Sequence, residues 1–163
     1  MSYMIDFMKN RPLKKFPEYL CYRHPKSNVY MLSNKEGKLV GRMVAMPEYI
    51  SGGTLYNPNK AGYFSLYIKR LFIEKEFRKK GAGRAFLNIA AKDSYNRSCQ
   101  GNVHLVAQAL ESGGAPPQPF YRKFGFDSQN KSQMKAVDEF IKNGTPLPKY
   151  KWTTLMYFPA DKK

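Results

Sequence analysis

Cysteine and long apolar runs are both scarce in this sequence. Its two cysteines, Cys21 and Cys99, are too few to staple a chain of 163 residues, which excludes a disulfide-stabilised scaffold. We expect both to be free thiols in a reducing, cytoplasmic setting. No apolar stretch approaches the length of a membrane span, and residues 1–11 lack the continuous apolar segment of a signal peptide. The sequence therefore predicts a cytoplasmic protein without a membrane span.

Acidic residues are scarce as well. Asp and Glu together number 12 against 28 Lys and Arg, so the net charge is +16. A field of that sign attracts polyanions, which makes nucleic acid, an acidic membrane surface and a phosphorylated cofactor candidate partners. A chain from a basic proteome that simply solvates its extra lysines would have the same composition. Composition does not choose among these explanations.

The remaining composition is that of a packed domain. The hydrophobic content of 42% and the aromatic content of 15% argue against disorder. The length fits one hydrophobic core, and no repeat, low-complexity tract or linker interrupts the chain. We therefore predict a single domain over residues 1–163.

Hydrophobic periodicity predicts an alternation of strands and helices. We expect an antiparallel hairpin whose second strand stops at Pro47, a loop from Pro47 to Gly62, and short helical pieces before Arg23. The predicted strands are Val29–Leu32, Leu39–Met46, Tyr63–Ile73, Val103–Ala107 and Lys151–Phe158. The predicted helices are one from Gly83, a short one around Phe120 and Tyr121 closed by Gly125, and one over Met134–Ile141. This pattern is typical of an α/β or α+β domain.

The most informative segment is the junction between the longest strand and a helix, Arg78-Lys79-Lys80-Gly81-Ala82-Gly83. Its two glycines let backbone amides approach a ligand closely. The unpaired amides and the dipole of a helix start favour an anion, and the basic side chains add charge, so a pyrophosphate fits. A plain glycine turn with solvated lysines explains the same residues. The turn lacks both the Lys-Ser/Thr ending of a nucleoside-triphosphate loop and the three-glycine spacing of a dinucleotide fold.

The residues around this turn favour the ligand site. Leu71-Phe72-Ile73 precedes Arg78-x-x-Gly81-x-Gly83, a helix and a buried strand follow, and then comes Phe120-Tyr121-x-x-x-Gly125-Phe126. From about Tyr63 to Phe126, this order and spacing resemble the GNAT superfamily of N-acyltransferases. The resemblance implies an α/β (α+β) fold with a mixed, mostly antiparallel sheet, a splayed pair of parallel strands and flanking helices.

The resemblance also implies acetyl-CoA, or another short acyl-CoA, as cosubstrate, and no metal. The strand backbone would bind the pantetheine arm and polarise the thioester carbonyl, and the amides of the turn would hold the pyrophosphate. The implied CoA-binding residues are Leu71, Phe72, Ile73, Arg78, Lys79, Lys80, Gly81, Ala82, Gly83 and Arg84. Tyr121 matches the family tyrosine near the thioester sulfur. It is the candidate general acid, because a phenol and a thiol have comparable pKa values.

The base that accepts the proton of the amine is harder to assign. Many relatives place a carboxylate on the splayed strand, but residues 65–70 contain no acid. Tyr67 is a candidate for ordering a water, and Glu111, just past the buried strand, is the candidate carboxylate. We expect His104 to be a hydrogen-bonded structural histidine. The remaining aromatic residues of the second motif are expected in the core: Phe120, Phe124 and Phe126.

Two features depart from the family. Residues 113–117 stand where many relatives carry an Asn that touches pantetheine, so that contact is missing or supplied by backbone, and the helix before Tyr121 starts late. An extra helical segment at about 128–148 lies between the last two strands. It could form one wall of the acceptor site, or it could cover a sheet edge.

We therefore predict an N-acyltransferase, most simply an N-acetyltransferase, in which an amine attacks the thioester directly in a ternary complex. The acceptor would be a small-molecule or protein amine or, given the positive charge, an amine linked to nucleic acid. No membrane partner is expected, and a homodimer is a further candidate. Two alternatives stay open: a basic nucleic-acid-binding module, and a GNAT fold that binds acyl-CoA without catalysis.

Overall fold

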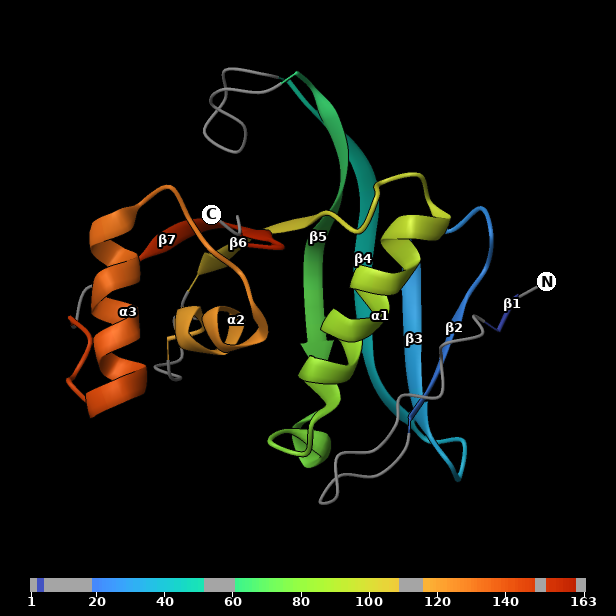
Figure 1. The fold of residues 1–163 in the computed structure, drawn as a ribbon. Coiled ribbons are helices and arrows are strands. Elements are labelled where there is room, and N and C mark those ends of the chain that lie inside the picture. The colour runs from blue at the N-terminus through green and yellow to red at the C-terminus, as the bar shows by residue number, and fades with distance from the viewer. Residues whose placement is uncertain (1–2, 5–18, 52–60, 109–115, 149–151, 161–163) are drawn as a thin grey trace.

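The computed structural model describes residues 3–4, 19–51, 61–108, 116–148 and 152–160. These residues form a seven-stranded sheet in chain order, with helix α1 lying across one face and helices α2 and α3 beside the last two strands (Figure 1). The strands are β1 (Tyr3–Met4), β2 (Tyr19–Arg23), β3 (Val29–Asn34), β4 (Leu39–Ile50), β5 (Tyr63–Ile73), β6 (Val103–Gln108) and β7 (Thr153–Phe158). The helices are α1 (Ala82–Asn96), α2 (Gln118–Phe124) and α3 (Lys131–Asn143), with a 3-10 turn at Lys75–Phe77.

All neighbouring strands pair antiparallel except β5 and β6, which run parallel. A parallel pair needs a crossover, and α1 supplies it, as Figure 1 shows. The predicted fold class, a mostly antiparallel mixed sheet with one parallel pair and flanking helices, is therefore confirmed.

Strand β4 is longer than the sequence indicated. It continues past Pro47 to Ile50, which pairs with Tyr63 of β5. The amide of Ala45 points to the β3 side, where it donates to the carbonyl of Asn28, and β3 pairs no further than Val44. Since amide directions alternate along a strand, the missing amide of Pro47 would face the side on which β3 has already ended. The prediction that Pro47 ends the strand is wrong.

The helical pieces expected before Arg23 are also contradicted where the structure describes them. Tyr3–Met4 and Tyr19–Arg23 are strands, and they pair with each other. Residues 5–18, which include Phe7 and Met8, lie outside the described residues. At Tyr3–Met4 and Tyr19–Arg23, pairing in the sheet therefore prevails over the predicted helix.

Helix α1 buries its apolar face against the sheet. Its residues Phe86, Leu87, Ile89 and Ala90 are at most 1% exposed and belong to the same core as Met43, Ala45, Leu66 and Ile68 of β4 and β5. Gly41 of β4 faces this helix, because a Cβ there would lie 3.1 Å from Cε2 of Phe86 and 2.4 Å from the carbonyl oxygen of Phe72. Alternate side chains of β4, from Arg42 to Glu48, therefore face away from α1.

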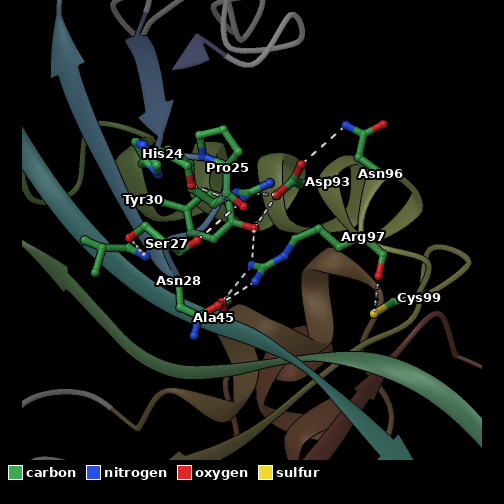
Figure 2. A network of polar contacts seen from close by, with 12 residues as sticks. His24, Pro25, Ser27, Asn28, Tyr30, Ala45, Asp93, Asn96, Arg97 and Cys99 are labelled. Atoms are coloured by element: carbon green, nitrogen blue, oxygen red, sulfur yellow. Dashed lines mark hydrogen bonds and ion pairs between the residues drawn. The ribbon is translucent and has the colours of Figure 1, made fainter. Parts of the chain in front are cut away.

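A buried polar network ties the C-terminal end of α1 to the first strands (Figure 2). Asp93 is 1% exposed; its carboxylate accepts from the Tyr30 hydroxyl and forms an ion pair with Arg23 at 3.0 Å. Arg97 donates to the Tyr30 hydroxyl at 3.1 Å and to the carbonyl of Ala45 at 2.8 Å. Because each buried polar group has a partner, the network stabilises this end of the helix rather than offering a site.

Helices α2 and α3 pack against each other at the β7 end of the sheet. The α3 helix starts at an Asn130 cap that accepts from the amide of Gln133, and it ends at Gly144 in the left-handed conformation; it contains the predicted helix Met134–Ile141. Thr154 of β7 donates to Gln133 at 2.7 Å and accepts from Gln118 of α2. The segment thus lies beside the outermost strand, β7.

Candidate functional site

The parallel strands β5 and β6 pair over only three residues and then part. The last pair is Ile68 with Leu105, yet β5 continues to Ile73 and β6 to Gln108. Directly after Ile68 the register between β4 and β5 shifts, and Lys69 is the extra residue of a bulge. A bulge bends its strand and strengthens the local twist, so it turns β5 away from β6. We call the opening between residues 69–73 and 106–108 the splay.

At the end of β5, the backbone N–H and C=O groups of every second residue point toward the splay. The amide of Glu74 donates to the carbonyl of Val40 on β4, so Glu74 and Phe72 direct their backbone groups to β4. Leu71 and Ile73 therefore direct theirs to the open side. The carbonyl of Ile73 already accepts from Nε of Arg78 at 3.0 Å. Of the three residues named from sequence, Leu71 and Ile73 have backbone groups that can meet a ligand in the splay.

The turn between β5 and α1 ends in an uncapped helix. Lys79 and Gly81 both have left-handed φ angles, of 61° and 84°. Gly81 is the N-cap and makes no side-chain hydrogen bond, and the first intrahelical amide is that of Ala85, which donates to the carbonyl of Gly81. The amides of Ala82, Gly83 and Arg84 therefore stand at the free end of the helix, where an anion is favoured.

Positive side chains surround this end of α1. Arg78, Lys79, Lys80 and Arg84 are all exposed, and the first turn of α1 contains no acid. The Tyr19 hydroxyl of β2 donates to the carbonyl of Lys80 at 2.8 Å, which fixes the turn against the sheet. The nearby Glu76 pairs with Lys38 at 3.0 Å, so it is engaged away from the turn.

Gly83 lies against Phe120 of α2. A Cβ at position 83 would lie 3.1 Å from Cζ of Phe120, so a side chain there would displace the ring. Phe120 is 41% exposed, which makes the prediction that it is a core residue wrong; Phe126, at 1%, is in the core as predicted. The ring brings an apolar wall beside the amides of α1, a contact between helices that sequence reasoning missed.

Tyr121 follows Phe120 on α2 and is partly buried. Its ring makes edge contacts with Phe120 and Phe126, at centroid distances of 5.3 Å and 5.6 Å. Among the described residues its hydroxyl has no hydrogen-bond partner, and burial raises the pKa of the phenol. Such a group stays protonated at neutral pH and has a proton to donate.

A second cluster lies on the sheet face opposite α1. His104 of β6 is 2% exposed, with Nδ1 at 2.7 Å from the Ser65 hydroxyl and Nε2 at 3.2 Å from Oε1 of Glu48. The ring stacks on Tyr67 of β5 at a centroid distance of 5.1 Å. His104 is hydrogen-bonded, as expected from sequence. Glu48 was not among the site residues predicted from sequence, because a loop was expected after Pro47. The extension of β4 past Pro47 brings Glu48 beside Ser65 and His104.

The other candidate carboxylate, Glu111, lies outside the described residues. The start of α3, the segment before it and strand β7 line a hollow of about 290 Å³, with Ser128, Gln133, Thr154 and Tyr157 among its residues. The position of this segment beside β7 fits a role in covering the sheet edge, and a role as a wall of the acceptor site stays a prediction.

In the described ranges no His, Cys, Asp and Glu gather as metal ligands. None of the described helices is long and apolar enough to cross a membrane.

Comparison with one solved structure, with a TM-score above 0.5, supports the fold. AtaT complexed with acetyl-methionyl-tRNAfMet is 15% identical with a TM-score of 0.51, over 80% of this chain and 69% of that one. Naa50 from Arabidopsis thaliana, in complex with a bisubstrate analogue of CoA and a peptide, is 17% identical with a TM-score of 0.47, over 80% and 72%. An acetyltransferase from Corynebacterium glutamicum related to histone acetyltransferase HPA2 is 14% identical with a TM-score of 0.46; the chain covers 65% of its length. No curated protein sequence matches this chain significantly.

The family model described as the acetyltransferase (GNAT) domain matches residues 25–128. This range contains the splay, the turn at the start of α1, Tyr121 and the Glu48–His104 cluster. It spans most of the chain, and the fold agrees with it. The chain therefore belongs to the GNAT acetyltransferase family.

Proposed function

We propose that this protein transfers an acyl group, most simply acetyl, from CoA to an amine by direct attack in a ternary complex. The observation that carries the proposal is the parting of β5 and β6 directly before an uncapped, positively charged helix N-terminus. The two features lie at the two ends of the segment from Lys69 to Ala82. An elongated ligand with a phosphate group at one end and a reactive carbonyl at the other fits this arrangement.

The residues of the site fit acyl-CoA. The amides of Ala82, Gly83 and Arg84 would hold the pyrophosphate, and the exposed basic residues of the turn would offset its charge. The open backbone groups of Leu71 and Ile73 would bind the amide-rich pantetheine arm as an added strand would. Bound acyl-CoA supplies an activated thioester carbonyl for the transfer.

Tyr121 would give its proton to the departing thiolate. Its hydroxyl is protonated at neutral pH, since the ordinary pKa of a phenol is about 10 and burial raises it, and within the described residues no other group competes for that proton. The neighbouring Phe120 packs beside Gly83, so α2 connects the pyrophosphate end of the site to the tyrosine. General acid help of this kind contributes on the order of 10²–10⁴ in rate.

The acceptor would reach the thioester from the sheet face opposite α1, since α1 covers the other face. A net charge of +16 favours an acceptor that carries negative charge, such as an amine linked to nucleic acid. The relative AtaT was solved with an acetylated aminoacyl-tRNA, and that compound class belongs in the first screen for this chain. The cytoplasmic location, a homodimer and the single-domain assignment stay predictions from the sequence.

The test is thiol release from acetyl-CoA in the presence of amino-acid amides, spermine, a lysine-containing peptide and bulk aminoacyl-tRNA, with the products read by mass spectrometry. Tyr121→Phe should lower kcat by about 10²-fold or more, because the acid is lost while the ring remains. The matched control is Tyr95→Phe on α1, where the side chain is 69% exposed and outside the site.

Calorimetry with acetyl-CoA separates the alternatives. If Tyr121→Phe binds acetyl-CoA as well as the wild type but no longer transfers the acetyl group, the result supports an enzyme. Binding of acetyl-CoA by the wild type without transfer to any of the amines would favour a non-catalytic acyl-CoA binder. A wild type that ignores acetyl-CoA but binds oligonucleotides with a steep salt dependence would be a nucleic-acid-binding module instead.

A further inference from the structure

Within the described part of the chain, the carboxylate of Glu48 extends across the sheet face opposite α1 toward the splay. Glu48 pairs with Ser65 in the β4–β5 register, and its side chain reaches over β5 to Nε2 of His104 on β6. It links three adjacent strands at one level of the sheet. The Glu48 side chain is 47% exposed, whereas that of His104 is 2% exposed. The Glu48 carboxylate is therefore held by the hydrogen bond to His104, while about half of the side chain stays accessible to an arriving molecule.

His104 holds this carboxylate through the hydrogen on Nε2. Both ring nitrogens are engaged, Nε2 with the Glu48 carboxylate and Nδ1 with the Ser65 hydroxyl. A carboxylate accepts, so Nε2 carries the hydrogen, and in a neutral ring Nδ1 then accepts from the Ser65 hydroxyl. Burial lowers the pKa of His104, although the bond to Glu48 opposes the shift. The neutral imidazole is therefore the form present at neutral pH, and its single N–H points at Glu48.

The cluster lies at the edge of the splay. Tyr67 and His104 form the middle one of the three parallel pairs, and only Ile68 with Leu105 separates them from the point where the strands part. Their side chains face away from α1, toward the acceptor side. Among the residues that the structure describes, the titratable side chains that contact His104 or pair with it on this face are Glu48 from β4, Tyr67 from β5 and Tyr157 from β7. Of these, Glu48 alone is a carboxylate.

We propose that Glu48 is the base that takes the proton from the acceptor ammonium, and that His104 is the residue that positions it. The inference rests on the proposed acyl transfer. It explains why β5 carries no acid near the splay: the carboxylate comes from β4, through the extension past Pro47. Tyr67 then serves as the surface on which the His104 ring is held in plane.

The proton balance of the transfer is complete with these groups. The ammonium gives one proton to Glu48, which passes it to solvent, and the free amine forms the C–N bond. As the C–S bond breaks, the thiolate takes the proton of Tyr121. The nitrogen loses its second proton to solvent, and from solvent Tyr121 is reprotonated. The products are the amide, the thiol and one released proton, and no oxidant or metal is needed.

Glu48→Gln tests the base with little change in structure. Glutamine keeps the length of the side chain and an oxygen that accepts from Nε2 of His104, but it cannot take a proton. We expect kcat/KM for the best amine of the panel to fall about 10²–10⁴-fold at neutral pH. The deficit should shrink at alkaline pH, because the variant depends on amine that is already deprotonated, and its rate should rise tenfold per pH unit below the pKa of the amine. Glu36→Gln, on the exposed β3–β4 turn, is the matched control.

His104 is tested as a positioning residue by rescue. His104→Gln can still donate an N–H to Glu48, whereas His104→Leu fills the buried site without a donor, so the first should retain more activity than the second. Acetyl-CoA affinity should stay within about twofold of the wild type in all these variants, since none of them touches the CoA site.

The outcomes are distinct. A wild type that does not transfer acetyl groups contradicts the proposed function itself. An active wild type with an equally active Glu48→Gln variant, at every pH, contradicts this inference alone. An active His104→Leu variant would leave Glu48 as a base but overturn the role of His104.

Discussion

Helix α1 ends in two different surroundings. At its C-terminal end, Asp93 and Arg97 bond to Tyr30, Arg23 and the β4 backbone in a buried network (Figure 2). At its N-terminal end, Gly81 offers no capping side chain, and the surrounding lysines and arginines are exposed. The same helix thus has one end whose polar groups satisfy each other and one end whose donors stay available.

The difference separates stability from function along one element. A buried network that is complete stabilises the fold and leaves nothing for a ligand to bind. An end with glycine as its N-cap lacks the hydrogen bond of a capping side chain, at a cost of about a few tenths of a kcal/mol, and leaves its amides available to an anion. Substitutions at the two ends should therefore change different measurements.

The largest expected effect is on stability, at the C-terminal end. Asp93→Ala leaves Arg23, whose side chain is 11% exposed, without its carboxylate, and it leaves the Tyr30 hydroxyl without its acceptor. We expect the free energy of unfolding to fall by about 3–5 kcal/mol, measured by urea denaturation. Acetyl-CoA affinity of the folded protein should be unchanged at low temperature. A variant that stays as stable as the wild type, or that loses CoA affinity while folded, would break the comparison.

The next effect is on binding, at the N-terminal end. Gly83→Leu should displace Phe120 and cover the amides of α1, because even a Cβ would lie 3.1 Å from that ring. We expect the Kd for acetyl-CoA to rise at least about tenfold, or 1.4 kcal/mol, in calorimetry. Gly83→Ala is the graded control. Its single methyl group requires only a small shift of the Phe120 ring, so the variant should bind acetyl-CoA nearly as well as the wild type. If the wild type and Gly83→Leu bound acetyl-CoA equally well, the pyrophosphate would not lie at the amides of α1.

The smallest expected effect comes from removing one exposed positive charge near either end of α1. Lys79→Gln removes one exposed charge beside the free end of α1, and Lys26→Gln removes one near the opposite end. A solvent-screened charge contributes about 0.2–1 kcal/mol, so the first variant should weaken acetyl-CoA binding modestly and reduce its salt dependence. The second should change neither. The same response from both would mean that net charge, and not its placement, governs binding.

Local signals carried most of what could be predicted. The turn from Arg78 to Gly83 and its helix are adjacent in sequence, so glycine spacing and periodicity were enough to place them. The apolar spacing of Met134–Ile141, which predicted α3, is equally local. Pro47 misled the prediction because a proline ends a strand only where its missing amide would have had a partner, and that depends on where β3 ends.

Tertiary structure decided the rest of the site. The contact of Gly83 with Phe120 joins two helices, and the cluster of Glu48, His104 and Tyr67 joins three strands. No spacing within one segment encodes which residues face each other across a sheet, because register is set by pairing over the whole length of the strands. The sequence by itself determined that glycines and basic residues gather at the start of α1, because they are neighbours in the chain; the paired strands decided which carboxylate lies beside the splay.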